Sequence, residues 1–194
     1  MLRDLVVKNR SYRGFSQDFT PSRGELLELC DLARQCSSSV NMQPLKYYLV
    51  NTPEQCAVLQ PLTGWARRLA ASVTLPREGH CPTAFIVICQ DLDVAANKER
   101  FLKDVGIVAQ TMLLGAVEKG FGGIMIGNFS PEKVAEALRL EENLWPQLII
   151  ALGMPDEKVV LTETAKDGSV AYTRDENHVT YVPKRSLDEV VINR

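Results

Sequence analysis

Apolar residues recur at helical spacing in several stretches of the chain. The predicted helices span residues 2–9, 20–35 and 97–119, and further helices begin after Thr52 and Ser130. Capping signals mark these starts, since Ser22 stands three residues before Glu25 and Thr52 three residues before Gln55. The 97–119 stretch is apolar on more than one face, so we expect a helix buried from several sides, ended by the glycines at 120, 122 and 123.

Short apolar runs alternate with these helices and predict strands. They cover residues 45–50, 83–89, 124–126 and 148–152, the last closed by Gly153 and Pro155. The 83–89 run lacks the alternation of a half-exposed strand, so we expect a central strand covered on both faces. Residues 169–181 alternate around a turn and predict a polar hairpin. An extended apolar tail at 189–192 follows, and a partner subunit would supply the surface that it needs.

The composition indicates a soluble protein with one core. The chain has 194 residues, of which 45% are hydrophobic, and a net charge of -2. One domain is the default for this length. Acids slightly outnumber bases, so no nucleic-acid partner is indicated. The absence of a run of about 18 apolar residues predicts a cytoplasmic protein without membrane contact.

The cysteines and histidines predict neither disulfides nor a metal site. Five cysteines occur without Cys-x-x-Cys spacing and are interpreted as free thiols. The two histidines, His80 and His178, have no cluster of further metal ligands near them in the sequence. Cys36 alone adjoins a polar loop, which leaves a catalytic thiol as an alternative. A serine hydrolase is disfavoured because the sequence contains no Gly-x-Ser-x-Gly motif.

A polar loop between a predicted helix and a predicted strand is the first candidate site. It carries five short hydrogen-bonding side chains, Ser37, Ser38, Ser39, Asn41 and Gln43. Pro44 then keeps the chain extended into the strand. An ordinary helix-to-strand connection explains the same residues, so the loop alone decides nothing.

Three distant segments add cations and a glycine turn. Arg10, Ser11 and Arg13 can converge on one anion, although basic residues at a helix end also complement the helix dipole. After Ile126, which ends a predicted strand, Gly127 and Asn128 form a turn whose backbone can approach a planar ligand, or a plain strand-to-helix connection. Lys184 and Arg185 precede the C-terminal tail. Together with the polar loop, these segments suggest a flavin nucleotide site.

These motifs resemble the nitroreductase family of FMN-dependent flavoproteins along nearly the whole chain. Residues 9–13, Asn-Arg-Ser-Tyr-Arg, are similar to the family's Arg-Arg-Ser-x-Arg, which binds the FMN phosphate and the pyrimidine edge; Asn9 replaces the first arginine. Residues 37–44 resemble the family's serine loop, which reaches the flavin of the other subunit. Leu45 stands where the family often has an aromatic residue.

The same resemblance assigns roles to the remaining segments. The 97–119 helix is similar to the family's dimer helix, with Asp104-x-Gly106-x-x-x-Gln110 matching a recurring pattern and Gln110 able to touch the flavin. The turn at 126–128 matches the one whose backbone faces the flavin N5 side, and Lys184 and Arg185 match a pair that closes on the phosphate. The implied fold is α+β: a single domain over 1–194, with a central mixed sheet wrapped by helices. The implied assembly is an intertwined homodimer in which the extension 183–194 is exchanged onto the partner.

The resemblance implies an oxidoreductase that uses FMN. NADH or NADPH would reduce the flavin, and a small acceptor such as a nitroaromatic or quinone would reoxidise it, because the cofactor carries the hydride and electron chemistry. Arg13 would stabilise the anionic reduced flavin, and backbone donors at Gly127 or Asn128 would face N5. Alternatives are flavin fragmentation, reductive dehalogenation or flavin binding without turnover. The 61–82 segment is expected to form part of the substrate mouth that separates the alternative reactions. Within it, Arg67 and Arg68 can reach a bound anion or form a solvated pair.

Overall fold

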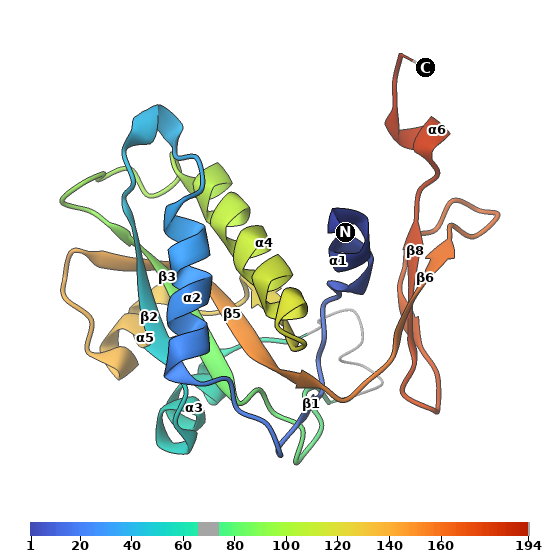
Figure 1. Cartoon of the computed structure of the whole chain (residues 1–194), viewed down its shortest axis with the longest axis horizontal. Helices are drawn as coiled ribbons and strands as arrows, with labels where there is room; N and C mark the ends of the chain where they lie inside the picture. The colour runs from blue at the N-terminus through green and yellow to red at the C-terminus, as the bar shows by residue number, and fades with distance from the viewer. Residues whose placement is uncertain (66–73, 194) are drawn as a thin grey trace. The chain divides into compact units, whose positions relative to one another are not determined.

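A computed structural model describes residues 1–65 and 74–193 of the chain (Figure 1). The chain divides into two compact units, Met1–Pro155 and Asp156–Arg194. The second unit begins well before position 183, where the sequence places the start of an extension. Arg67 and Arg68, which belong to the expected substrate mouth, lie outside the described residues. The single-domain organisation stays a prediction.

An antiparallel sheet of five strands forms the centre of the first unit. Its strands are β1 (Phe15–Ser16), β2 (Leu45–Val50), β3 (Ala84–Asp91), β4 (Gly122–Ile126) and β5 (Leu144–Pro155). β2 pairs with β3, β3 with β5, and both β4 and β1 with β5. The expectation of a mixed central sheet is wrong for the described residues, because all of these strand pairs are antiparallel. The isolated bridge between Ser11 and Gly123 is parallel.

Two strand boundaries differ from the prediction because proline and glycine are accommodated inside the sheet. β5 runs through Pro146 and Gly153 instead of covering only 148–152. Pro146 lies opposite Cys89, next to a register shift after Ile88, where the ladder is already irregular and a missing N–H is tolerated. At Gly153 the Phe15 ring occupies the space of a Cβ. β4 likewise begins at Gly122, so two of the glycines expected to end the preceding helix belong to a strand.

In the described part of the first unit, five α-helices accompany the sheet, and the capping signals locate most of their starts. They are α1 (Leu2–Lys8), α2 (Arg23–Arg34), α3 (Pro53–Leu59), α4 (Leu102–Glu118) and α5 (Pro131–Leu138). Short 3-10 turns follow as η1 (Ser39–Asn41) and η2 (Gln60–Leu62). The capping box at Ser22 and the cap at Thr52 are confirmed. α4 starts later than the predicted position 97, because the Asn97 side chain accepts the N–H groups of Glu99 and Arg100 and closes a turn there.

The helices cover the two faces of the sheet in pairs. Ile86 and Ile88 of β3 pack with the buried residues of α2 and α4. Phe85 and Val87 pack on the opposite face with buried residues of α3 and α5. This confirms the expectation of a central strand covered on both faces. Figure 1 shows α2 and α4 side by side. No helix within the described ranges is long and apolar enough to cross a membrane.

The second unit is a small sheet followed by a short helix. Its elements are β6 (Val159–Glu163), β7 (Thr173–Arg174), β8 (Thr180–Lys184) and α6 (Leu187–Val190). The predicted hairpin is confirmed with shorter strands, since β7 and β8 pair antiparallel. β6, which pairs parallel with β8, was not predicted. The extended tail is wrong at its start, because a capping box between Ser186 and Glu189 begins α6.

Candidate functional site

The serine loop, residues 37–43, joins α2 to β2 in an unusual backbone conformation. Val40, Asn41 and Gln43 have φ angles of 49°, 52° and 51°. Asparagine tolerates this left-handed region, but a β-branched valine rarely adopts it, at a cost of about 1–2 kcal/mol. The loop therefore keeps its shape only because other contacts hold it.

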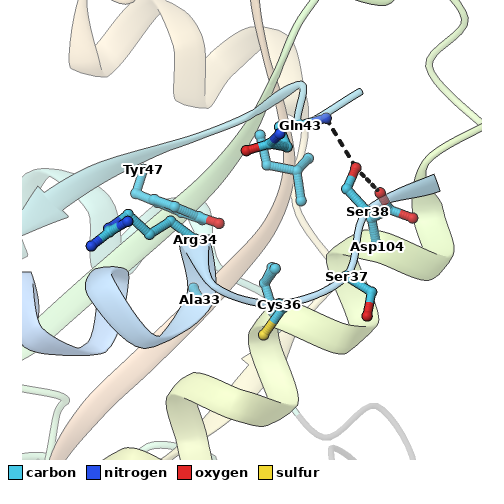
Figure 2. Close-up of a pocket in the computed structure, with 10 residues that line it drawn as sticks. Ala33, Arg34, Cys36, Ser37, Ser38, Gln43, Tyr47 and Asp104 are labelled. Carbon is cyan, nitrogen blue, oxygen red and sulfur yellow. Dashed lines mark hydrogen bonds between the residues drawn. The ribbon is translucent and has the colours of Figure 1, made fainter. Parts of the chain in front are cut away.

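A buried carboxylate provides those contacts (Figure 2). Asp104, in the first turn of α4, is 4% exposed. Its Oδ2 accepts the Ser38 hydroxyl at 2.6 Å and the Ser39 N–H at 2.9 Å, and Ser38 Oγ accepts the Gln43 N–H at 3.0 Å. The sequence singled out Asp104 only through the pattern that it shares with Gly106 and Gln110; the structure identifies the serine loop as the partner of its carboxylate.

Cys36 attaches the start of the loop to α4 at a second point. Its Sγ lies 3.2 Å from Thr111 Oγ1 and 3.6 Å from the Leu32 carbonyl oxygen. Neither partner is a base that would take the thiol proton. The alternative of a catalytic thiol at Cys36 gains no support from these contacts.

A small cavity lies beside the loop. Its volume is about 130 Å³. It is lined by Ala33, Arg34, Cys36, Ser37, Ser38, Gln43, Leu45, Tyr47, Asp104 and Val108 (Figure 2). Burial, with the Cys30 and Cys36 thiols nearby, raises the pKa of Tyr47 to about 12, so its phenol stays neutral. Pockets for cofactor-sized ligands start at about 300 Å³, so this cavity alone does not hold a flavin.

The arginine segment, residues 10–13, lies at the start of β4. Ser11 bridges to Gly123, and the Tyr12 N–H donates to the Gly123 carbonyl at 3.3 Å. The guanidinium groups bond to nearby backbone: Arg10 Nη2 to the Val6 carbonyl at 2.6 Å, and Arg13 Nη1 to the Ser11 carbonyl at 3.0 Å. Arg10 Nε is buried and meets no acceptor among the described residues. The segment thus presents a donor suited to an anion.

The glycine turn, residues 127–128, follows the other end of β4. Gly127 is exposed, and a Cβ there would meet nothing within 4 Å. The Asn128 carbonyl accepts the Gly64 N–H at 2.7 Å, and a Cβ on Gly64 would lie 1.8 Å from Asn128 Nδ2. The described start of the expected substrate mouth therefore packs directly on this turn, a contact that the sequence did not reveal. Ile126 is buried, so only its backbone is available to a ligand.

Within one chain the candidate residues form two groups that do not converge. The arginine segment and the glycine turn lie at opposite ends of β4, about 13 Å apart by the rise of a strand. The serine loop lies at the first turn of α4, whereas β4 begins beyond its last turn, about 21 Å further along the helix axis. Gln110 is exposed on α4 between these ends. Lys184 and Arg185 are exposed in the second unit, where Arg185 pairs with Glu189.

Comparison with known proteins identifies the relatives of this chain. The model of the Nitroreductase family matches residues 6–154. The Bacillus subtilis (strain 168) protein named "Putative NAD(P)H nitroreductase YdgI" is 22% identical over 180 residues, which cover 77% of this chain and 86% of that protein.

Solved structures share the fold at low sequence identity. A nitroreductase family protein from Streptococcus pneumoniae TIGR4 has a TM-score of 0.71 and 18% identity, with 100% of both chains covered. A nitroreductase from Exiguobacterium sibiricum 255-15, solved in complex with FMN, has a TM-score of 0.67 and 20% identity over 81% of this chain and 89% of that one. These likenesses show a nitroreductase-like α+β fold.

Proposed function

The chain belongs to the nitroreductase family, and we propose that it is an FMN-dependent oxidoreductase that passes electrons from NADH or NADPH to a small acceptor. The name of the Bacillus relative and the FMN complex of the Exiguobacterium structure support this reaction class. A nitroaromatic or a quinone is the acceptor class that the proposal names.

The residues of the arginine segment fit the phosphate of such a cofactor. Arg10 Nε is a buried donor without an acceptor among the described residues, and the Ser11 side chain is exposed beside it in sequence. A guanidinium and a hydroxyl are donors that bind phosphate through charge-assisted hydrogen bonds. On the family resemblance alone, Lys184 and Arg185 also bind the phosphate in this proposal.

The separation between the two groups of candidate residues carries the proposal of a site shared by two chains. The serine loop and the arginine segment lie at opposite ends of α4, so one chain does not bring these two around one ring. In a symmetric dimer, the serine loop of one chain can meet the arginine segment and glycine turn of the other. We propose that Ser37, Ser39, Asn41, Gln43 and Gln110 reach the flavin in this way.

Exposed apolar side chains support the homodimer. Leu102 and Ile107 on α4 are 49% and 44% exposed, and Leu2, Val6 and Val7 on α1 are exposed as well. Near the C-terminus, Leu187, Val190 and Ile192 are exposed too. Burial of apolar area is the main driving force for subunit association. We propose that α1 and α4 pack against the partner and that the C-terminal residues lie on its surface.

The protein's role in the chemistry is to bind and to tune. FMN, when bound, supplies the hydride and electron transfer. Arg13 places a permanent positive charge beside the site, which stabilises the negative charge of a reduced flavin. Backbone groups at Gly127 and Asn128 supply hydrogen bonds close to the ring, because Gly127 carries no side chain that would keep a ligand away.

A visible absorption spectrum followed by anaerobic titration tests the proposed function. The purified chain should be yellow, and NADH or NADPH should bleach it; adding a quinone should restore the colour. A colourless protein that binds no added FMN would contradict the proposal. A yellow protein that no nicotinamide bleaches would instead identify a flavin-binding protein without turnover.

A further inference from the structure

Some polar groups of the serine loop form hydrogen bonds within the chain, and others remain exposed. The Ser38 hydroxyl donates to Asp104 and accepts from the Gln43 N–H, so both of its functions are engaged inside the chain. The hydroxyls of Ser37 and Ser39 remain on exposed residues. Ser38 and Asp104 therefore hold the loop in place, while the hydroxyls of Ser37 and Ser39 stay available to a ligand.

The loop needs these stabilising contacts because its backbone is strained. Three non-glycine residues within four positions adopt positive φ angles, and Val40, at the centre, is 71% exposed and gains no burial in return. The Asp104 carboxylate receives one hydrogen bond from the Ser39 N–H, next to Val40, and one from the Ser38 hydroxyl, which in turn fixes the Gln43 N–H on the far side. These bonds to Asp104 and Ser38, which we call the anchor, thus fix the backbone on both sides of Val40 and Asn41.

We propose that Asp104 is the positioning residue of the flavin site: it holds the serine loop in a strained conformation ready for the flavin of the partner chain. The inference rests on the proposed function and deepens it. Asp104 itself is 4% exposed and its carboxylate is engaged with the loop, so it acts through Ser38 and Ser39 rather than on the ligand. An acceptor-only carboxylate suits this position, because all the groups that face it in these bonds are donors.

The first test replaces the carboxylate with an amide of the same shape. Both donors bond to the same oxygen, Oδ2, so the Asp104→Asn amide can offer them only an uncharged acceptor, and the loop loses the charge assistance of both bonds. We expect FMN to leave the Asp104→Asn holoprotein at least about tenfold faster than the wild type, measured by the recovery of free flavin fluorescence after dilution. With saturating FMN, kcat should stay within about twofold, since Asp104 does not touch the reacting groups.

Asp4→Asn is the matched control. Asp4 is also the third residue of its helix, so the substitution removes the same interaction with a helix dipole, but Asp4 is exposed and holds no loop. We expect FMN to leave the Asp4→Asn protein at the wild-type rate. Equal FMN release from the Asp104→Asn protein and the wild type would overturn the proposal, as would a loss of kcat in saturating FMN that matches the loss of binding.

A double-mutant cycle with Ser38 separates positioning from general destabilisation. Ser38→Ala should speed FMN release in a protein that keeps the buried carboxylate, and adding Asp104→Asn should produce much less than the product of the two effects, because both remove one shared bond. Multiplicative effects would overturn the proposal. If the Asp104→Asn protein does not fold, Ser38→Ala alone tests the proposal. Release of FMN from the Ser38→Ala protein at the wild-type rate would then overturn the proposal.

Hydrogen exchange separates a failure of this inference from a failure of the proposed function. In protein without FMN, the amides of Ser39 and Gln43 should exchange faster in Asp104→Asn than in the wild type. If these amides exchange faster in Asp104→Asn but the chain binds no FMN, the result would support the anchoring role of Asp104 and contradict the proposed function as a flavoprotein. Unchanged exchange in a chain that binds FMN would contradict the anchor alone.

Discussion

The two ends of α4 present polar groups in opposite states. At its first turn, the Asp104 carboxylate is buried and its hydrogen bonds are made within the chain, to a serine loop with strained backbone. Beyond its last turn, Arg10 bonds to the Val6 carbonyl and Arg13 to the Ser11 carbonyl, and Arg10 keeps its Nε donor unused among the described residues. One end is fixed before any ligand arrives; the other end is able to exchange local partners for an anion.

This difference indicates a division of labour. A pre-formed loop lowers the ordering entropy that a ligand must overcome, whereas the unused Nε donor of Arg10 is available to the charge of a ligand. Substitutions at the first end should therefore change stability and binding. Substitutions near β4 should change turnover.

The largest expected effect is on stability at the fixed end. Asp104→Ala leaves the Ser38 hydroxyl and the Ser39 N–H without their acceptor, so we expect a loss of about 3 kcal/mol in the free energy of unfolding, measured by urea denaturation. Asp4→Ala should lose less than about 1 kcal/mol, because Asp4 is exposed. Equal losses in the two variants would show that Asp104 contributes no more than a surface helix cap.

Arg13→Ala tests the other end. We expect reductive turnover by NADH to fall about a hundredfold, because a charge that stabilises the reduced flavin is lost. FMN retention should fall only a few-fold, because Arg10 and Ser11 still bind the phosphate. Stopped-flow bleaching and FMN dissociation measure the two quantities separately, and Lys133→Ala, on the exposed surface of α5, serves as the control. Proportional losses in both quantities would remove the assigned role of Arg13.

Gly64→Ala should reduce turnover by about tenfold through the glycine turn. A Cβ at position 64 would lie 2.6 Å from Asn128 Cγ, so the Asn128 side chain must move. Gly24→Ala is the control, since its Cβ would make only an ordinary contact with Ser22 Oγ at 3.8 Å. Steady-state kinetics in saturating FMN compares the two variants. An unchanged kcat in Gly64→Ala would exclude a role in turnover for the contact between Gly64 and Asn128.

Val40→Asn should stabilise the protein by about 0.5–1 kcal/mol, because asparagine adopts positive φ more readily than valine. Val58→Asn, at another exposed valine but in the regular helix α3, should give no gain. Urea denaturation of the two variants compares them. A loss of stability in Val40→Asn would mean that the loop is not strained at this position.

The last prediction concerns stability at alkaline pH. Burial raises the pKa of Cys30 and Cys56 to about 11 and that of Cys89 to about 12. The unfolded chain loses these protons first, near the ordinary thiol value of 9.0, so stability should be full below pH 9 and fall as the pH rises from there towards the folded-state values. Urea midpoints measured across this range check the sign; a rise in stability above pH 9 would contradict it.

The sequence predicted the elements whose signals are local. Ser22, Thr52 and Ser130 have capping side chains, and the apolar run of β3 is long enough to identify a central strand. β1 was missed because two residues carry no periodic pattern. The start of α4 was misplaced because Asn97 caps a turn through its side chain, a choice that spacing does not decide.

The site was predictable as a set of residues, but its geometry was not. Motif resemblance selected Ser38, Arg13 and Gly127, yet the positive φ of Val40 contradicts the ordinary preference of valine and follows only from tertiary contacts. The pairing of Asp104 with Ser38 joins residues 66 positions apart, and Gly64 meets Asn128 across a similar separation. Such contacts depend on the folded topology and leave no local pattern.

Subunit complementation tests the shared site most directly. Chains carrying Arg13→Ala and chains carrying Asp104→Asn are co-expressed with different tags, and the mixed dimer is purified through both. If each flavin lies between the β4 end of one chain and the serine loop of the other, the mixed dimer holds one intact site and should show about half of wild-type turnover at limiting FMN. A mixed dimer no more active than the two impaired parent proteins would contradict a site built from two chains.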